Sequence, residues 1–137
     1  MNPDSEHLKI PPISPAAAGP LYRQIVEGVR REISEGRLRP GEPLPSFRAL
    51  AENLLVSLIT VKRAYEELER EGIIYRKQGL GTFVSDNGAA RSRAVKRRDA
   101  EDLMAQAVRE GAEARMSERE ILDLARRLIR ERMESEK

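Results

Sequence analysis

Residues 44–84 form the run that most constrains how this chain can fold. They read LPSFRALAENLLVSLITVKRAYEELEREGIIYRKQGLGTFV. The apolar spacing predicts two short helices separated by a tight turn, and the β-prone residues that follow predict a hairpin. A helix-turn-helix with a wing is the simplest structure that accounts for this order. Because such structures are used mainly to read DNA, the run predicts a DNA-binding surface.

Serine residues mark the beginnings of the two predicted helices. Ser46 is a suitable N-cap for a helix that continues to about Leu54. Ser57 caps the second helix, which we expect to continue to Glu71 and to end at Gly72. Apolar residues recur on this helix at the spacing of one buried face, and they are Val61, Ala64, Tyr65 and Leu68.

The predicted wing consists of two β-prone runs, residues 73–76 and 82–85, with glycines between them. Its tip offers Lys77, Gln78 and the unhindered backbone of Gly79 and Gly81 to a phosphate backbone or a minor groove. A nucleotide-binding loop is a poor alternative, because a strand rather than a helix follows the glycines.

The remaining sequence divides around this winged domain, which we place at residues 20–86. Four prolines predict a flexible segment over residues 1–19, apart from a short edge strand that Leu8, Ile10 and Ile13 could form. A first helix is expected from Pro20 to Gly36. Residues 87–98 are expected to form a basic linker, which either is simply solvated or adds phosphate contacts.

Two further helices are expected in residues 99–137, the first from about Asp99 to Arg115. Ser117 and Glu120 form a capping box that starts the second. Two such short helices cannot be stable alone, so they pack on the winged domain or, as we expect, on a second copy. The residues expected at this dimer interface are Leu103, Met104, Ala107, Val108, Ile121, Leu124, Ala125 and Leu128.

Composition narrows the chemistry that this chain can perform. It has no cysteine and one histidine, His7, so thiol chemistry, zinc fingers and Ser/His/Asp catalysis are excluded. We therefore expect no enzyme, no metal and no cofactor. No apolar run approaches the roughly 18 residues of a membrane span, which predicts a soluble cytoplasmic protein.

The net charge is only +2, from 25 basic and 23 acidic residues, so overall charge alone does not indicate nucleic-acid binding. The prediction depends instead on where particular cations lie. Arg48 falls in the first turn of the helix that precedes the predicted reading helix. A guanidinium beside helix N-termini is well suited to hold a phosphate.

The stretch over residues 20–85 resembles the DNA-binding domain of GntR-family bacterial transcriptional regulators. The motifs that carry the resemblance are PLYRQI, LPSFRALA, TVKRAYEELEREG and GLGTFV. The short tail with MSEREILDL is similar to the YtrA subfamily, whose members dimerise through two C-terminal helices. The resemblance implies a homodimeric regulator, expected to be a repressor, on a palindromic operator. A small-molecule effector is possible but is not indicated.

The same resemblance places DNA contacts on particular residues. The arginine of the LPSFR motif is Arg48, the reading-helix contacts are Ser57, Thr60 and Lys62, and the wing glycines are Gly79 and Gly81. The residues expected to bind DNA are Ser46, Arg48, Ser57, Leu58, Ile59, Thr60, Lys62, Arg63, Lys77, Gln78, Gly79, Gly81 and Thr82.

Leu58 stands where many GntR regulators have an arginine that contacts DNA. Either Leu58 or Ile59 could meet a thymine methyl group, or Leu58 could pack against the protein.

Two other functions of the protein remain open at this point. One is an architectural DNA binder with little sequence preference, and the other is a protein-interaction module that uses Leu58 and Ile59.

Overall fold

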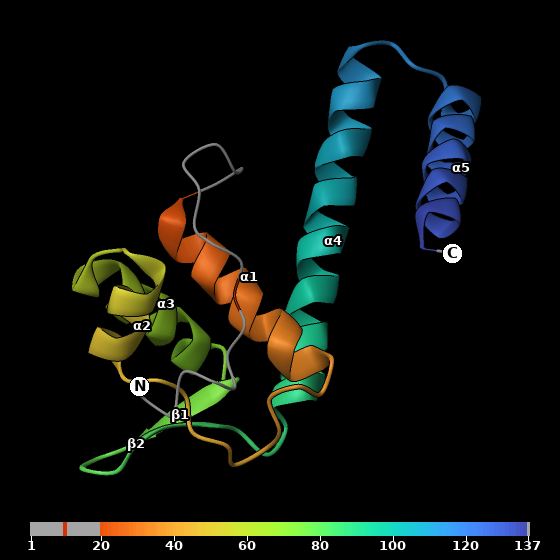
Figure 1. Ribbon diagram of the computed structural model, residues 1–137. Helices are drawn as coiled ribbons and strands as arrows, with labels where there is room; N and C mark the ends of the chain where they lie inside the picture. The colour runs from red at the N-terminus through yellow and green to blue at the C-terminus, as the bar shows by residue number, and fades with distance from the viewer. Residues whose placement is uncertain (1–9, 11–19, 137) are drawn as a thin grey trace. The chain divides into compact units, whose positions relative to one another are not determined.

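The computed structural model describes Ile10 and residues 20–136, and it divides the chain into the units Met1–Lys96 and Arg97–Lys137. Five helices and a two-stranded antiparallel sheet are present in this described part (Figure 1). In chain order they are α1 (Leu21–Ser34), α2 (Phe47–Leu54), α3 (Leu58–Arg70), β1 (Ile74–Lys77), β2 (Gly81–Val84), α4 (Gly88–Glu113) and α5 (Glu118–Ser135). The predicted fold class, mainly helical with a small hairpin in a winged helix-turn-helix, is confirmed.

The core of the first unit lies between α1, α3 and the hairpin. The face of α3 predicted to be apolar is buried throughout, and it packs against the apolar stripe of α1. The buried apolar residues are Ile25, Val26, Val29, Ile33, Leu38, Leu44, Leu50, Ala51, Val61, Ala64, Tyr65, Leu68, Ile73, Ile74 and Val84. A charged pair also joins the two helices, since the nearly buried Arg30 of α1 donates hydrogen bonds to the carboxylate of Glu71 after α3.

The turn between α2 and α3 is built by one residue in an unusual conformation. Leu55 ends α2 with φ 57° and ψ 45°. This is the left-handed region, which residues other than glycine seldom adopt. The backbone N–H of Val56 then donates to the carbonyl oxygen of Ala51, at 3.1 Å. This tight reversal brings the start of α3 close to the end of α2.

The wing has the predicted order, with each strand displaced by one residue from the expected bounds. Ile74 pairs with Val84 and Lys77 with Gly81, which leaves a three-residue tip. Gly79, at φ 78°, occupies a backbone conformation that favours glycine. Residues 41–44 run along the other edge of β2, where the N–H of Leu44 donates to the carbonyl oxygen of Thr82 at 2.8 Å.

The expected basic linker at residues 87–98 is wrong, because α4 begins at Gly88 rather than near Asp99. The residues Asp86-Asn87-Gly88 are typical of a turn, but here that turn leads directly into a helix. Gly88 and Ser92 are buried and Ala89 packs against the core, so the first turns of α4 belong to the winged unit. Tertiary packing, rather than local sequence, therefore decides where this helix begins.

The second unit contains the rest of α4 and all of α5, joined by residues 114–117 (Figure 1). The predicted capping box is confirmed: the Ser117 hydroxyl accepts from the N–H of Glu120 at 3.1 Å, and the Glu120 carboxylate accepts from the N–H of Ser117 at 3.2 Å. Gly111 allows Ile121 to approach α4, since a Cβ at that position would lie 3.1 Å from Ile121 Cδ1.

The N-terminal strand expected around Leu8 and Ile13 lies outside the described residues. Ile10, which is described, packs beside Gly28 of α1 and against the edge of the core. Among the described residues, no helix has the combination of length and apolar character that crossing a membrane requires.

Candidate nucleic-acid interface

The start of α3 is the central element of the candidate interface. The Ser57 hydroxyl accepts a hydrogen bond from the N–H of Thr60 at 3.1 Å and lies 2.8 Å from the Thr60 hydroxyl. This cap fixes the first turn of the helix. Leu58 and Ile59 follow the cap directly, and both side chains are exposed to solvent.

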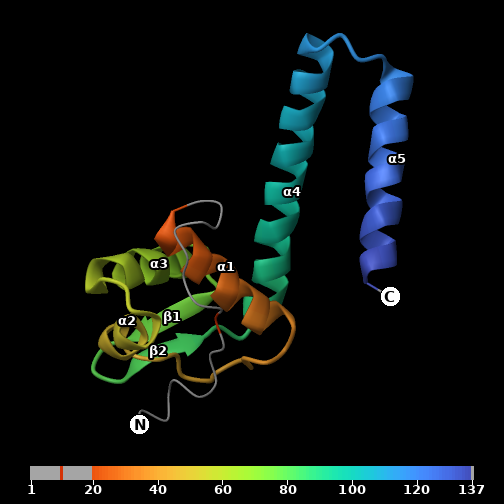
Figure 2. The ribbon, with the colours of Figure 1, turned by 45° about the horizontal axis from the view of Figure 1, so that its top comes forward.

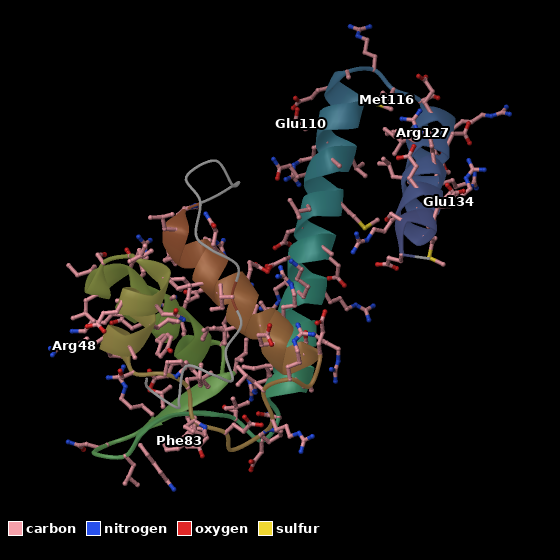
Figure 3. The ribbon with its side chains drawn as sticks, in the orientation of Figure 1. Arg48, Phe83, Glu110, Met116, Arg127 and Glu134 are labelled. Carbon is pink, nitrogen blue, oxygen red and sulfur yellow. The ribbon has the colours of Figure 1, made fainter. Side chains whose placement is uncertain are left out.

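Arg48 occupies the first turn of α2, where the Ser46 hydroxyl accepts from the N–H of Ala49 at 3.1 Å. Its side chain is exposed, and Figure 3 shows it extending outward from the domain. An arginine at a capped helix start combines a full positive charge with the partial charge of free backbone N–H groups. The arrangement is therefore suited to hold a phosphate.

A shallow groove joins the beginning of α2 to the wing, and the two also lie side by side in Figure 2. Its walls are residues 43–47 and residues 76–82, and its volume is about 480 Å³. The groove brings Ser46 together with five other predicted site residues, which are Lys77, Gln78, Gly79, Gly81 and Thr82. Their separation in sequence is closed by the pairing of residues 41–44 with β2.

Phe47 and Arg76, two residues that sequence reasoning missed, also line this groove. The guanidinium carbon of Arg76 in β1 lies 4.9 Å from the ring centroid of Phe47, and Lys62 Nζ of α3 lies 6.0 Å from the same ring. Phe47 thus holds one cation from the wing and one from the reading helix. The alternation of β1 could have indicated Arg76 as exposed, but only the fold places it beside Phe47.

Arg63, also predicted to contact DNA, stacks on a different ring. Its guanidinium carbon lies 4.0 Å from the centroid of Tyr22 in α1. A second groove, of about 510 Å³, follows the outer face of α3 and includes Ile59, Lys62 and Arg63 together with Glu66 and Glu67. Lys62 and Arg63 of α3 are therefore held against aromatic rings and accompanied by carboxylates.

The basic residues at the start of α4 make contacts within their own unit. Lys96 Nζ lies 3.1 Å from a carboxylate oxygen of Glu27, and Arg93 donates to the carbonyl oxygen of Ser34 at 3.4 Å. The Arg91 side chain packs beside Gly72, where a Cβ would lie 3.0 Å from Arg91 Cδ. These contacts favour a structural role for this stretch over additional phosphate contacts.

No group of three or more His, Cys, Asp or Glu side chains suited to a metal ion occurs in residues 20–136. The candidate interface contains instead capped helix starts, exposed cations and a glycine-rich tip. These features define the protein as a winged helix-turn-helix protein of the kind that binds DNA.

Comparisons with known proteins give the family. The sequence model described as "Bacterial regulatory proteins, gntR family" matches residues 21–84. The solved structure of YtrA from Sulfolobus acidocaldarius, titled a GntR-family transcription factor, is 32% identical, with 73% of this chain and 98% of that chain covered and a TM-score of 0.59. The chain belongs to the GntR family, and within it the chain is similar to YtrA.

Two further likenesses bear on the site. The HTH-type transcriptional repressor YtrA of Bacillus subtilis (strain 168) is 43% identical over 75 residues, which are 55% of this chain and 58% of that protein. The chain thus matches little more than half the length of this curated relative. The structure titled AraR(DBD) in complex with operator ORX1 is 31% identical, covering 58% of this chain and 98% of that chain, with a TM-score of 0.51.

Proposed function

We propose that this protein is a sequence-specific transcriptional regulator, acting as a repressor, that binds a palindromic operator as a homodimer in the bacterial cytoplasm. The observation that carries the proposal is the groove between the start of α2 and the wing, with Arg48 and the start of α3 exposed beside it. In this arrangement α3 enters the major groove, Arg48 holds a phosphate, and the wing contacts the adjacent backbone or minor groove.

The comparisons support each part of the proposal to a different extent. The structurally similar AraR domain is described as complexed with its operator, which supports duplex DNA as the ligand. The Bacillus subtilis relative is named a repressor, which supports repression rather than activation.

Dimerisation is supported by the apolar residues that the second unit leaves uncovered. No residue of α5 is buried, and Leu103, Met104, Val108 and Leu128 are all more than half exposed. The other residues predicted for the interface, apart from Ala107, are half-buried, and they are Ile121, Leu124 and Ala125. A second copy of the unit would remove these side chains from water, a substantial gain per side chain.

The proposal is tested by selecting binding sites from a library of random DNA duplexes with the full chain. We expect enrichment of an inverted repeat whose half-sites lie about one helical turn, roughly 34 Å, apart or a multiple of it. Binding without any enriched sequence, together with a steep salt dependence, would instead identify an architectural DNA binder. Absence of all duplex binding would overturn the proposal.

A further inference from the structure

We infer that Ile59 reads the C5-methyl group of a pyrimidine in the operator's major groove. The inference rests on the proposed function and concerns how base sequence is recognised. Ile59 is 77% exposed, whereas Leu58 beside it is 38% exposed. Both side chains are therefore exposed in the first turn of α3, and Ile59 is much the more exposed of the two.

The polar groups of the same turn are engaged within the protein. The Ser57 and Thr60 hydroxyls lie 2.8 Å apart, and the Ser57 hydroxyl also accepts from the Thr60 N–H. Their mutual hydrogen bond holds both hydroxyls at the helix cap. Ile59 is thus the most exposed apolar side chain of α3.

The cations that follow on α3 each lie over an aromatic ring. Lys62 lies over Phe47 at 6.0 Å, and Arg63 lies over Tyr22 at 4.0 Å. A guanidinium at the start of a reading helix would favour guanine through its O6 and N7 atoms. Here the residue in that position is Leu58, so this preference for guanine is missing.

An aliphatic side chain in the major groove has one favourable partner on the base edges. Thymine presents a C5-methyl group there, whereas the other unmodified bases present only polar donors and acceptors beside ring C–H groups. Burying one methyl group against Ile59 is expected to contribute about fourfold in affinity. A 5-methylcytosine presents the same group and would satisfy the same contact.

The test uses the full chain and an operator obtained by selection from random duplexes. Each thymine of one half-site is replaced in turn by uracil, which removes the methyl group and preserves base pairing. We expect one position at which wild-type affinity falls about fourfold. The Ile59→Ala variant should bind the thymine and uracil duplexes equally.

The matched control is Leu80→Ala, which truncates another exposed aliphatic residue, at the wing tip. This variant should retain the full difference between thymine and uracil. At the sensitive position, a cytosine and a 5-methylcytosine are compared as well. A gain from methylation of cytosine would show that any C5-methylpyrimidine is read, and no gain would restrict the contact to thymine.

Two results would overturn the inference while leaving the proposed function intact. One is an operator that loses no affinity at any uracil substitution. The other is an equal loss for the wild type and Ile59→Ala, which would assign the methyl contact to another residue. If selection enriches no duplex at all, the proposed function fails and the inference fails with it.

Discussion

The Tyr65 hydroxyl of α3 donates a buried hydrogen bond of 2.8 Å to the carbonyl oxygen of Pro45, the residue that precedes the Ser46 cap of α2. The Tyr65 ring also meets Phe47 edge to face, with centroids 5.1 Å apart. One side chain of α3 thus fixes both the entry into α2 and the ring over which Lys62 and Arg76 lie.

Tyr65→Phe should destabilise the fold by about 1–3 kcal/mol, because the buried Pro45 carbonyl loses its hydrogen-bond donor. Urea-induced unfolding monitored by circular dichroism measures the change. Tyr75→Phe is the matched control, since Tyr75 lies on the exposed side of β1. Removing its hydroxyl group should change the free energy of unfolding by less than about 0.5 kcal/mol. Equal effects of the two variants would contradict the structural role of the Tyr65 hydroxyl.

The same hydroxyl predicts a loss of stability at alkaline pH. Burial raises the pKa of Tyr65 above its ordinary value of 10.0, so the folded protein keeps this proton while the unfolded chain releases it. The stabilisation is complete below pH 10 and declines as the pH rises above it, by up to about 1.4 kcal/mol per unit. The stability difference between the wild type and Tyr65→Phe should therefore shrink above pH 10, and a constant difference would contradict the prediction.

Local signals in the sequence were sufficient for most of the winged unit. The capping serines and the apolar face of α3 are determined by neighbouring residues, and the structure confirms them. The beginning of α4 was missed, because Asp86-Asn87-Gly88 has the local character of a turn. The first turns of this helix pack against the winged unit and bury Ser92, and this tertiary contact cannot be inferred from neighbouring residues. The stacking of Arg63 on Tyr22 was equally beyond local reasoning, because the two residues are distant in sequence.

The left-handed conformation of Leu55 predicts that Leu55→Gly stabilises the protein by about 1 kcal/mol. Leu55 is 91% exposed, so its side chain contributes little packing that the substitution could remove. Chemical denaturation measures the gain. Leu55→Ala is the control, because alanine shortens the side chain but retains the unfavourable conformation and should leave stability unchanged. A similar gain in both variants would attribute the effect to the side chain rather than to the backbone.

Removing the guanidinium of Arg48 should weaken operator binding at least tenfold without unfolding the domain, because the side chain is exposed and is proposed to hold a phosphate. Fluorescence anisotropy with Arg48→Ala should also give a salt dependence shallower by about 0.9 in log–log slope. Arg31→Ala is the control, since Arg31 lies beside α4 residues rather than beside α2 and the wing. Unchanged affinity in Arg48→Ala would remove this residue from the interface.

The uncovered apolar face of the second unit predicts that charges placed there separate the proposed dimer. Leu103 and Val108 are 65% and 51% exposed, so the double variant Leu103→Glu, Val108→Glu should fold as an isolated chain. In the dimer each copy would bury two carboxylates in an apolar contact, which is costly. Sedimentation should show monomers, and operator affinity should fall at least tenfold because one half-site is lost. Arg109→Glu is the control, since the helical period places Arg109 on the opposite side of α4. A double variant that still sediments as a dimer would show that the interface lies elsewhere.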